Sequence, residues 1–314
     1  MTALWQTLLL LAITSSSLGA PQDYLQQRWE EWQVTHGRRY SSQGEEEGRR
    51  RAWQVNQDLV EAHNKRMDVG FSLEMNQFAD GILQERHPVL PAVQPHSWTV
   101  ARVDDVKVSL TPPPSFDWRS KGVISAVKNQ GTIGSADAVA SEECMESWNT
   151  INTGKMVNIS YQEIADCCRA QNDTVFDCIH NIGGVCGEGD YPVTTGQCQN
   201  NTCHPDLQIQ GGIKLPPRRP DLMITALLQR PLLVYVDASH VTFQLYEGGV
   251  YSDPNCSTER VDHALQLVGY GQKEGQKYWI CKNSWSSRWG MDGYIWIRRG
   301  SDECAIESYV SYPY

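Results

Sequence analysis

The chain has 314 residues, 40% of them hydrophobic, and carries 10 cysteines and 11 tryptophans. At ~150 residues per domain this length allows roughly two domains, and the apolar fraction is too high for a disordered protein. The net charge of -10 argues against binding to nucleic acid or to anionic membranes.

Residues 1–20 predict a cleaved secretory signal peptide. An apolar run from Leu8 to Ile13 precedes small residues that suit cleavage after Gly19 or Ala20; the alternative is a buried N-terminal helix. The run is too short to span a bilayer, and no other stretch approaches the ~20 apolar residues that a span needs. We therefore expect a secretory-pathway protein, extracellular or lysosomal, without a membrane span.

The cysteines also indicate an oxidising compartment. The number of cysteines is even, and all of them follow residue 143. The sequence lacks the repeated CxxC pairs that would indicate a zinc site, so we expect disulfides and no metal or other cofactor. Four N-glycosylation sequons fit the same route, although such triplets also arise by chance. They begin at Asn158, Asn172, Asn200 and Asn255.

The arm that follows the signal is predicted to be helical at residues 24–36 and 45–66, with a strand at 71–75. In the second helix, steps of three and four place six residues on one face. They are Glu45, Arg49, Trp53, Asn56, Val60 and Asn64. The polar members of that face each need a partner if the face is packed.

A proline-rich stretch separates this cysteine-free arm from the cysteine-bearing body. Six prolines between residues 88 and 114 predict an extended linker. The body then predicts a helical half and a β-rich half, an α+β arrangement. The expected helices are 134–152, 161–168 and 221–229, and the expected strands are 232–236, 264–270, 277–282 and 293–298.

Several dispersed motifs carry a family resemblance. They are Phe116-Asp-Trp-Arg, Val127-Lys-Asn-Gln-Gly131, Asp262-His-Ala, Tyr278-Trp-Ile-Cys-Lys-Asn-Ser-Trp285 and Trp289-Gly-Met-Asp-Gly-Tyr294. Together they resemble the papain-family, cathepsin L-like cysteine peptidases. The six-residue helical face, and Asn76, Phe78 and Asp80, resemble that family's two propeptide motifs, with Glu74 where a small residue is usual.

The resemblance implies a papain-like two-part fold, with a helical left part and an antiparallel β-barrel right part, behind a helical inhibitory propeptide. The implied division is a signal peptide at 1–20, a cathepsin-type propeptide at 21–86, a Pro-rich linker at 87–113 and a peptidase-homology domain at 114–314.

The resemblance also implies roles for four residues of the body. In the family, a thiolate at a helix N-terminus attacks the scissile carbonyl beside an imidazolium. His263 matches that imidazole, Asn283 the amide that orients it, and Trp285 the aromatic ring that shields them. Gln130 matches the side chain that stabilises the oxyanion.

The nucleophile of the family is replaced. Where the family reads Gln-Gly-x-Cys-Gly-Ser-Cys-Trp, this chain reads Gln130-Gly-Thr-Ile-Gly-Ser-Ala-Asp137. Ala136 occupies the cysteine position, and its methyl group cannot form an acyl-enzyme. Cys144 lies eight residues further along the helix, about 12 Å away, and Ser135 is expected to point off the groove. The family's Gly-Cys-x-Gly-Gly element is also missing, so we expect a remodelled groove.

Asp137 has two interpretations. Its carboxylate lies in the first turn of a helix, which is favourable, and could pair with His263 in the substrate-binding region. The favoured alternative is a solvated N-terminal acid.

The resemblance implies a Cys256–Cys304 disulfide, and a pairing of Cys167 with Cys198 or Cys203. The pairing of Cys168, Cys178 and Cys186 stays open. Cys144 and Cys281 are expected to be core residues.

We therefore expect an inactive papain-like peptidase homologue, a pseudopeptidase. It would bind a peptide or protein ligand in its groove, or its own propeptide. The alternative is an active cysteine-type endopeptidase.

Overall fold

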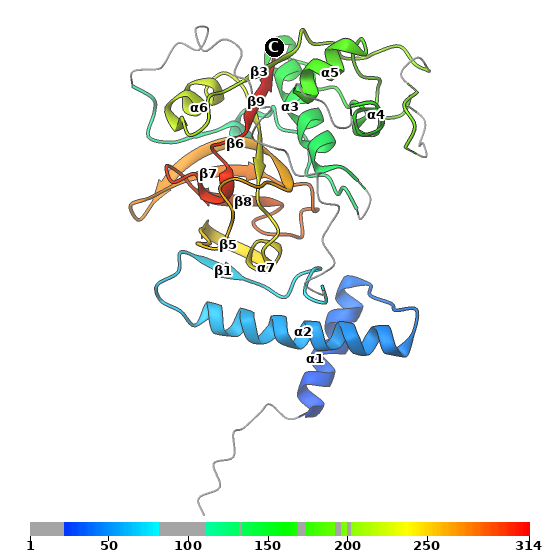
Figure 1. Ribbon diagram of the computed structural model, residues 1–314, viewed down its shortest axis with the longest axis vertical. Coiled ribbons are helices and arrows are strands. Elements are labelled where there is room, and N and C mark those ends of the chain that lie inside the picture. Colours follow the sequence, from blue (N-terminus) through cyan, green and yellow to red (C-terminus); the bar gives the residue numbers. More distant parts are fainter. Residues whose placement is uncertain (1–21, 82–110, 132–133, 169–173, 192–195, 200–201) are drawn as a thin grey trace, which may run out of the picture.

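The computed structural model describes residues 22–81, 111–131, 134–168, 174–191, 196–199 and 202–314. The expected signal peptide, most of the Pro-rich linker, Asn172 and Asn200 lie outside these residues. Figure 1 shows three layers: the arm at one end, a β-rich half in the middle and a helical half at the other end. The predicted α+β arrangement of a helical half and a β-rich half is thus confirmed.

The helices of the arm are α1 (Gln22–His36) and α2 (Gln43–Asn64). Those of the body are η3 (Trp118–Lys121), α3 (Ala136–Thr153), α4 (Tyr161–Cys167), α5 (Val175–Asn181), α6 (Pro220–Leu227), α7 (Val241–Gln244) and η4 (Glu303–Ala305). The strands are β1 (Phe71–Leu73), β2 (Phe116–Asp117), β3 (Gly212–Lys214), β4 (Leu232–Val236), β5 (Tyr246–Tyr251), β6 (His263–Lys273), β7 (Gln276–Lys282), β8 (Tyr294–Arg298) and β9 (Val310–Pro313).

One sheet joins the arm to the body. Its strand order is β1-β5-β8-β7-β6-β4-β9-β3, with β2 paired to β6 at the side. The β5–β8 pair is parallel, and the other ladders are antiparallel. Because β1 belongs to the arm and β5 to the body, backbone hydrogen bonds hold the arm against the β-rich half.

Two apolar cores fill the body. The first lies among the strands of the β-rich half and includes Trp279 and Trp289. The second surrounds α3 and takes in Leu233 and Tyr235 of β4. Since alternate residues of β4 pack into each of the two cores, this strand lies at the interface between the two halves.

The arm has a core of its own, built on stacked tryptophans. Trp29 and Trp32 of α1 pack with Trp53 of α2, and all three are buried. The two asparagines of the predicted face both bind backbone, although Asn56 is buried and Asn64, at the end of α2, is exposed. Asn56 Nδ2 donates to Ala79 O at 2.8 Å, and the Asn64 side chain exchanges two bonds with Leu73.

Four disulfides lie in the body. They are Cys167–Cys198, Cys168–Cys178, Cys186–Cys203 and Cys256–Cys304. Cys144 and Cys281 are buried free thiols. Among the helices described, none is long and apolar enough to cross a membrane. Four disulfides fit a protein that folds in an oxidising compartment.

Ser286, which follows Trp285, has a strained backbone. Ser286 has a φ of 69°, in the left-handed region that disfavours side chains with a Cβ. We expect Ser286→Gly to stabilise the chain by about 0.5 kcal/mol, because glycine adopts this φ without a steric penalty, and this gain exceeds the loss of the exposed bond that Ser286 Oγ accepts from Arg288 N at 3.2 Å. Chemical denaturation measures the change. The neighbouring Ser287→Gly, at an exposed residue whose φ is not positive, is expected to destabilise slightly, and equal shifts in both variants would contradict the strain.

Candidate active site

Ala136 is the first residue of α3, the long buried helix of the helical half. It is 1% exposed, at the end of the helix where backbone N–H groups would favour an anion. Ser135 is the N-cap, and its hydroxyl accepts from Ala138 N at 3.4 Å. The serine oxygen is therefore engaged in capping the helix, and the nucleophile position offers a methyl group.

Gln130 is held beside this helix end by its own close packing. A Cβ on Gly134 would lie 2.1 Å from Gln130 O, so only glycine fits at this position. Ser284 Oγ donates to Gln130 Oε1 at 2.5 Å, and Gln130 Nε2 donates to Gly134 O at 3.3 Å. The Gln130 amide that would donate to an oxyanion therefore already donates one hydrogen bond to the backbone of Gly134.

His263 and Asn283 form a buried pair. His263 begins β6 and Asn283 follows the adjacent strand β7, so the antiparallel ladder brings their side chains together. His263 Nε2 lies 2.7 Å from Asn283 Oδ1, which also accepts from Ser284 N at 2.8 Å. The backbone donor fixes which amide atom is oxygen, and an oxygen acceptor assigns the ring proton to Nε2.

An aromatic cluster covers this pair. The Trp285 ring lies 4.6 Å from that of His263, and Phe243 and Trp289 pack edge-on against Trp285 at 5.8 and 5.2 Å. Ring faces on the His–Asn contact exclude water and strengthen its hydrogen bond. Trp285 was predicted at this position, whereas Phe243 was not, because its four-residue helix α7 is too short to show a periodic pattern.

Asp137 is half-buried and hydrogen-bonded, so the favoured interpretation of a freely solvated acid is wrong. Its Oδ1 accepts a short hydrogen bond from the Tyr235 hydroxyl of β4, and within the described residues its partner is this tyrosine and not His263. Burial raises the pKa of Asp137 to about 6, and the bond from Tyr235 offsets part of that rise. Asp137 and Tyr235 therefore tie the two halves together one residue from Ala136.

Buried charges lie further along α3. Glu143 pairs with Lys282, the last residue of β7, at 2.7 Å, and both side chains are essentially fully buried. Glu142 and Glu146 share Lys128. Burial and the neighbouring Glu146 raise the pKa of Glu142 well above its usual range. This cluster was not predicted from the sequence, where consecutive glutamates in a helix with few other charges were the available signal.

The remaining thiols are unsuited to chemistry. Cys144 is fully buried in the core around α3, and burial raises its pKa well above the usual thiol value. Burial likewise raises the pKa of Cys281, on β7. A reactive cysteine needs exposure and a lowered pKa, and these two have neither.

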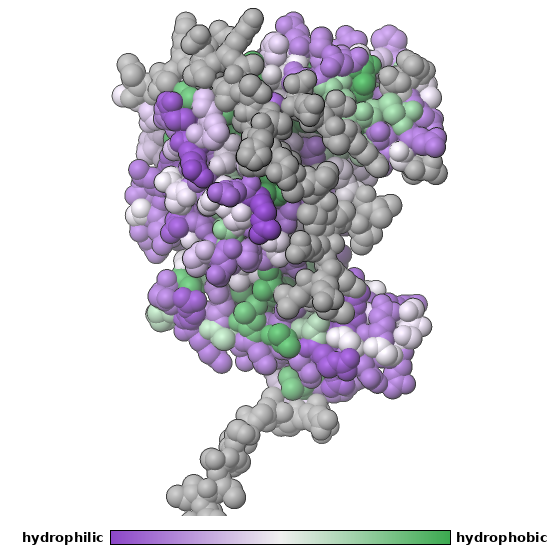
Figure 2. Space-filling view, viewed as in Figure 1, coloured by the Kyte–Doolittle hydropathy of each residue, from purple (hydrophilic) through white to green (hydrophobic). Residues whose placement is uncertain are grey.

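The arm reaches the site directly. Phe78 packs edge-on against Trp285 at 5.1 Å, and Gln77 Nε2 donates to Trp285 O at 3.0 Å. Asn76 Nδ2 donates to Gln244 O at 2.9 Å. On the face in Figure 2, hydrophobic residues gather where the arm meets the β-rich half, which fits docking through apolar contacts.

Comparison with known proteins agrees with this geometry. Residues 112–314 match the papain family cysteine protease profile, and residues 29–85 match the cathepsin propeptide inhibitor domain. The chain is 35% identical to procathepsin L of Mus musculus, over 98% of each chain. It is 33% identical to cathepsin S of Bos taurus, over 98% of this chain and 99% of the other.

Solved structures of precursors share the fold. A recombinant stem bromelain precursor matches with a TM-score of 0.82 at 34% identity, covering 93% of this chain and 99% of the other. A digestive procathepsin L2 of Tenebrio molitor matches with a TM-score of 0.83 at 30% identity, covering 92% and 99%. The chain therefore belongs to the papain family of cysteine peptidases, of the cathepsin L type, and carries that family's propeptide domain.

Proposed function

We propose that this chain is a non-catalytic papain-family homologue that acts by binding. The observation that carries the proposal is Ala136 at the N-terminus of α3, where covalent catalysis needs a thiolate. In a serine protease, loss of the nucleophile lowers turnover by about a million-fold. Neither the capping hydroxyl of Ser135 nor the buried thiol of Cys144 supplies a replacement.

The occupant of the groove that the contacts favour is the propeptide of the chain itself. Phe78 and Gln77 lie on Trp285, which covers His263, so a peptide at this point would have to displace them. A chain without a nucleophile cannot release the propeptide by self-cleavage. The ligand, a peptide or protein, would then meet the whole precursor or a form cut by another protease.

The route that we propose is the secretory pathway, ending outside the cell or in the lysosome. The apolar N-terminus, the four disulfides and the sequons support it. Asn158 and Asn255 are exposed, as acceptors of N-glycans must be, and Asn172 and Asn200 are proposed on their sequons alone. Mass determination of the secreted protein tests glycosylation, signal cleavage and propeptide retention together.

Activity measurements test the central proposal. Full-length protein, and protein whose linker has been cut by an added protease, are incubated with peptide substrates and with a thiol-directed epoxide. We expect no turnover above background and no labelling, while an active family member run in parallel shows both. The retained His263–Asn283 pair favours the rival, an active endopeptidase. Turnover abolished by His263→Ala, or epoxide labelling on α3, would establish the rival.

Propeptide docking is expected to depend on Glu74. This residue follows β1 and donates its N–H to Leu245 O at 2.8 Å, beside Glu247 of β5. Burial, and then the charge of Glu247, raise the pKa of Glu74 to about 7. A raised carboxyl pKa contributes stability while the group is protonated, and that contribution is lost as the pH rises from about 4.5 through 7.

We therefore expect Glu74→Gln to raise the melting temperature of the full chain at pH 8 and to leave it unchanged at pH 4. Thermal scans across this range measure the difference. Glu47→Gln, at an exposed position on α2, is the matched control and should show no pH-dependent difference. A constant difference for Glu74→Gln at every pH would contradict the buried charge.

A further inference from the structure

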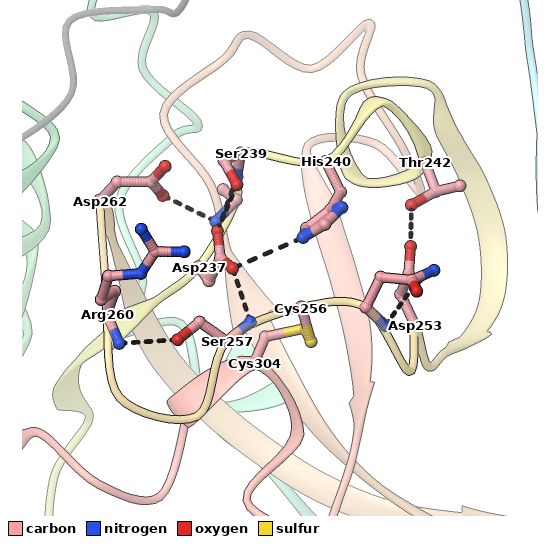
Figure 3. A network of polar contacts seen from close by, with 12 residues as sticks. Asp237, Ser239, His240, Thr242, Asp253, Cys256, Ser257, Arg260, Asp262 and Cys304 are labelled. Atoms are coloured by element: carbon pink, nitrogen blue, oxygen red, sulfur yellow. Dashed lines mark hydrogen bonds and ion pairs between the residues drawn. A yellow bond between two sulfur atoms is a disulfide. The ribbon is translucent and has the colours of Figure 1, made fainter.

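The loop between β5 and β6 carries the sequon Asn255-Cys256-Ser257 and leads into His263. Figure 3 shows Cys256 and Ser257 of this loop beside Cys304. The sequon is unusual because its middle residue forms a disulfide: Cys256 pairs with Cys304, 48 residues further along the chain. An acceptor site for a glycan and a cross-link therefore share three consecutive residues.

The folded loop engages the two side chains that glycan transfer requires. Asn255 Nδ2 donates to Asp253 Oδ1 at 3.0 Å, and the backbone N–H of Asn255 donates to the same oxygen at 2.9 Å. The Ser257 hydroxyl accepts from Glu259 N at 3.1 Å and from Arg260 N at 2.9 Å. Both groups thus form turns of the loop and are withheld from an enzyme that binds the sequon extended.

Buried carboxylates lock this shape on both sides. Asp237 accepts from Ser257 N at 2.7 Å, as Figure 3 shows. Asp253 accepts from Thr242 Oγ1 at 2.6 Å, and its own N–H donates to Glu303 Oε1 at 2.8 Å, beside Cys304. The strand-to-strand loop and the η4 segment are therefore joined by hydrogen bonds as well as by the disulfide.

We propose that Asn255 accepts an N-linked glycan only before the Cys256–Cys304 disulfide closes, so that glycosylation and disulfide formation compete for this loop. The proposal rests on the secretory route given above. The donor is a lipid pyrophosphate-linked oligosaccharide. A bond forms between Asn255 Nδ2 and the sugar C1, the bond from C1 to the pyrophosphate oxygen breaks, and the lipid pyrophosphate leaves with the electron pair. One amide proton is lost to base.

Attachment of the glycan does not prevent the disulfide from closing afterwards. Asn255 is exposed, so a sugar on Nδ2 extends into solvent, and the modified amide retains one N–H to donate to Asp253. The disulfide can therefore close after the sugar is attached. Mature protein then consists of two populations, with and without a glycan at Asn255, both carrying the disulfide.

Asn158 provides an internal control. Its sequon, Asn158-Ile-Ser160, contains no cysteine, and Ser160 instead caps α4 by accepting from Glu163 N at 3.2 Å. Its occupancy is expected to be independent of Cys304, and it also reports whether the chain has entered the compartment where glycans are added.

The test is glycan occupancy at both asparagines, measured by peptide mass spectrometry on full-length chains isolated from inside secretory cells. We expect partial occupancy of Asn255 in the wild type, because disulfide closure takes seconds or longer and competes with glycan transfer. In Cys304→Ser this disulfide cannot form, so the occupancy of Asn255 should rise at least about twofold. Cys256→Ser keeps a sequon and should give the same rise. Asn158 should not change.

Cys198→Ser breaks another disulfide and is the matched control for general misfolding. An equal rise at Asn255 in this variant would overturn the competition, as would equal occupancy in the wild type and Cys304→Ser. A bare Asn255 in every variant, with Asn158 glycosylated, would overturn Asn255 as an acceptor. Absence of a glycan from both Asn255 and Asn158 would overturn the secretory route. It would not bear on the absence of peptidase activity, which is tested separately.

Discussion

Ala136→Cys is expected to create a reactive thiolate in a chain that otherwise has none available. The new thiol would lie at the N-terminus of α3, where the helix dipole favours an anion, and family membership places it opposite the imidazole of the retained His263–Asn283 pair. We expect its pKa to fall below about 7, against about 8.5 for an ordinary cysteine. Alkylation by iodoacetamide between pH 4 and 9, on protein whose linker has been cut by an added protease and whose arm has been removed, measures it.

Two variants isolate the cause. Ala136→Cys with His263→Ala should react at least about tenfold more slowly at pH 6, because the imidazolium is gone. Ala136→Cys with Asp137→Asn should have a lower thiol pKa than Ala136→Cys alone, because the neighbouring carboxylate disfavours a second anion. The wild type supplies the background from Cys144 and Cys281, which are buried. Identical pH profiles in all three variants would show that the site no longer activates a thiol.

Lys282→Met is expected to destabilise the chain by about 3–5 kcal/mol, because it leaves the charge of Glu143 buried without its partner. For a domain of this size, such a loss lowers the melting temperature by roughly 10 °C. Adding Glu143→Leu should restore most of the loss, since removing both charges removes the desolvation penalty as well.

The matched control is Arg219→Met, which breaks the half-exposed Arg219–Asp221 pair. Its expected cost is at most about 1 kcal/mol, as for other surface ion pairs. Circular dichroism melts compare the four proteins. A loss in Lys282→Met no larger than in Arg219→Met would mean that water reaches the Glu143 carboxylate.

Long periodic elements were predictable from the sequence. The single packed face of α2 correctly placed Trp53 and Asn56 in the interior, and strand β4 was predicted with its bounds, because both patterns repeat over several residues. Strand β5 was missed. It contains Gly248 and Gly249, which weaken strand propensity, and it is stabilised by pairing with a strand of the arm far away in sequence.

The site divides in the same way. His263, Asn283 and Gln130 lie in motifs that identify them directly. The partner of Asp137 could not be predicted, since Tyr235 is 98 residues distant and only tertiary packing brings them together. The same holds for Glu143 and Lys282. Interactions between distant residues follow from the fold, and the sequence alone offers no pattern for them.

The docking of the arm through β1 and Phe78 has a consequence for any ligand in solution. Because the arm and the body belong to one chain, the arm stays at a high local concentration beside Trp285 while the chain is uncut. If the propeptide is retained, as we propose, a free peptide must compete by mass action with an occupant that is tethered to its site. Severing the tether would convert that permanent occupant into an ordinary, dilutable ligand.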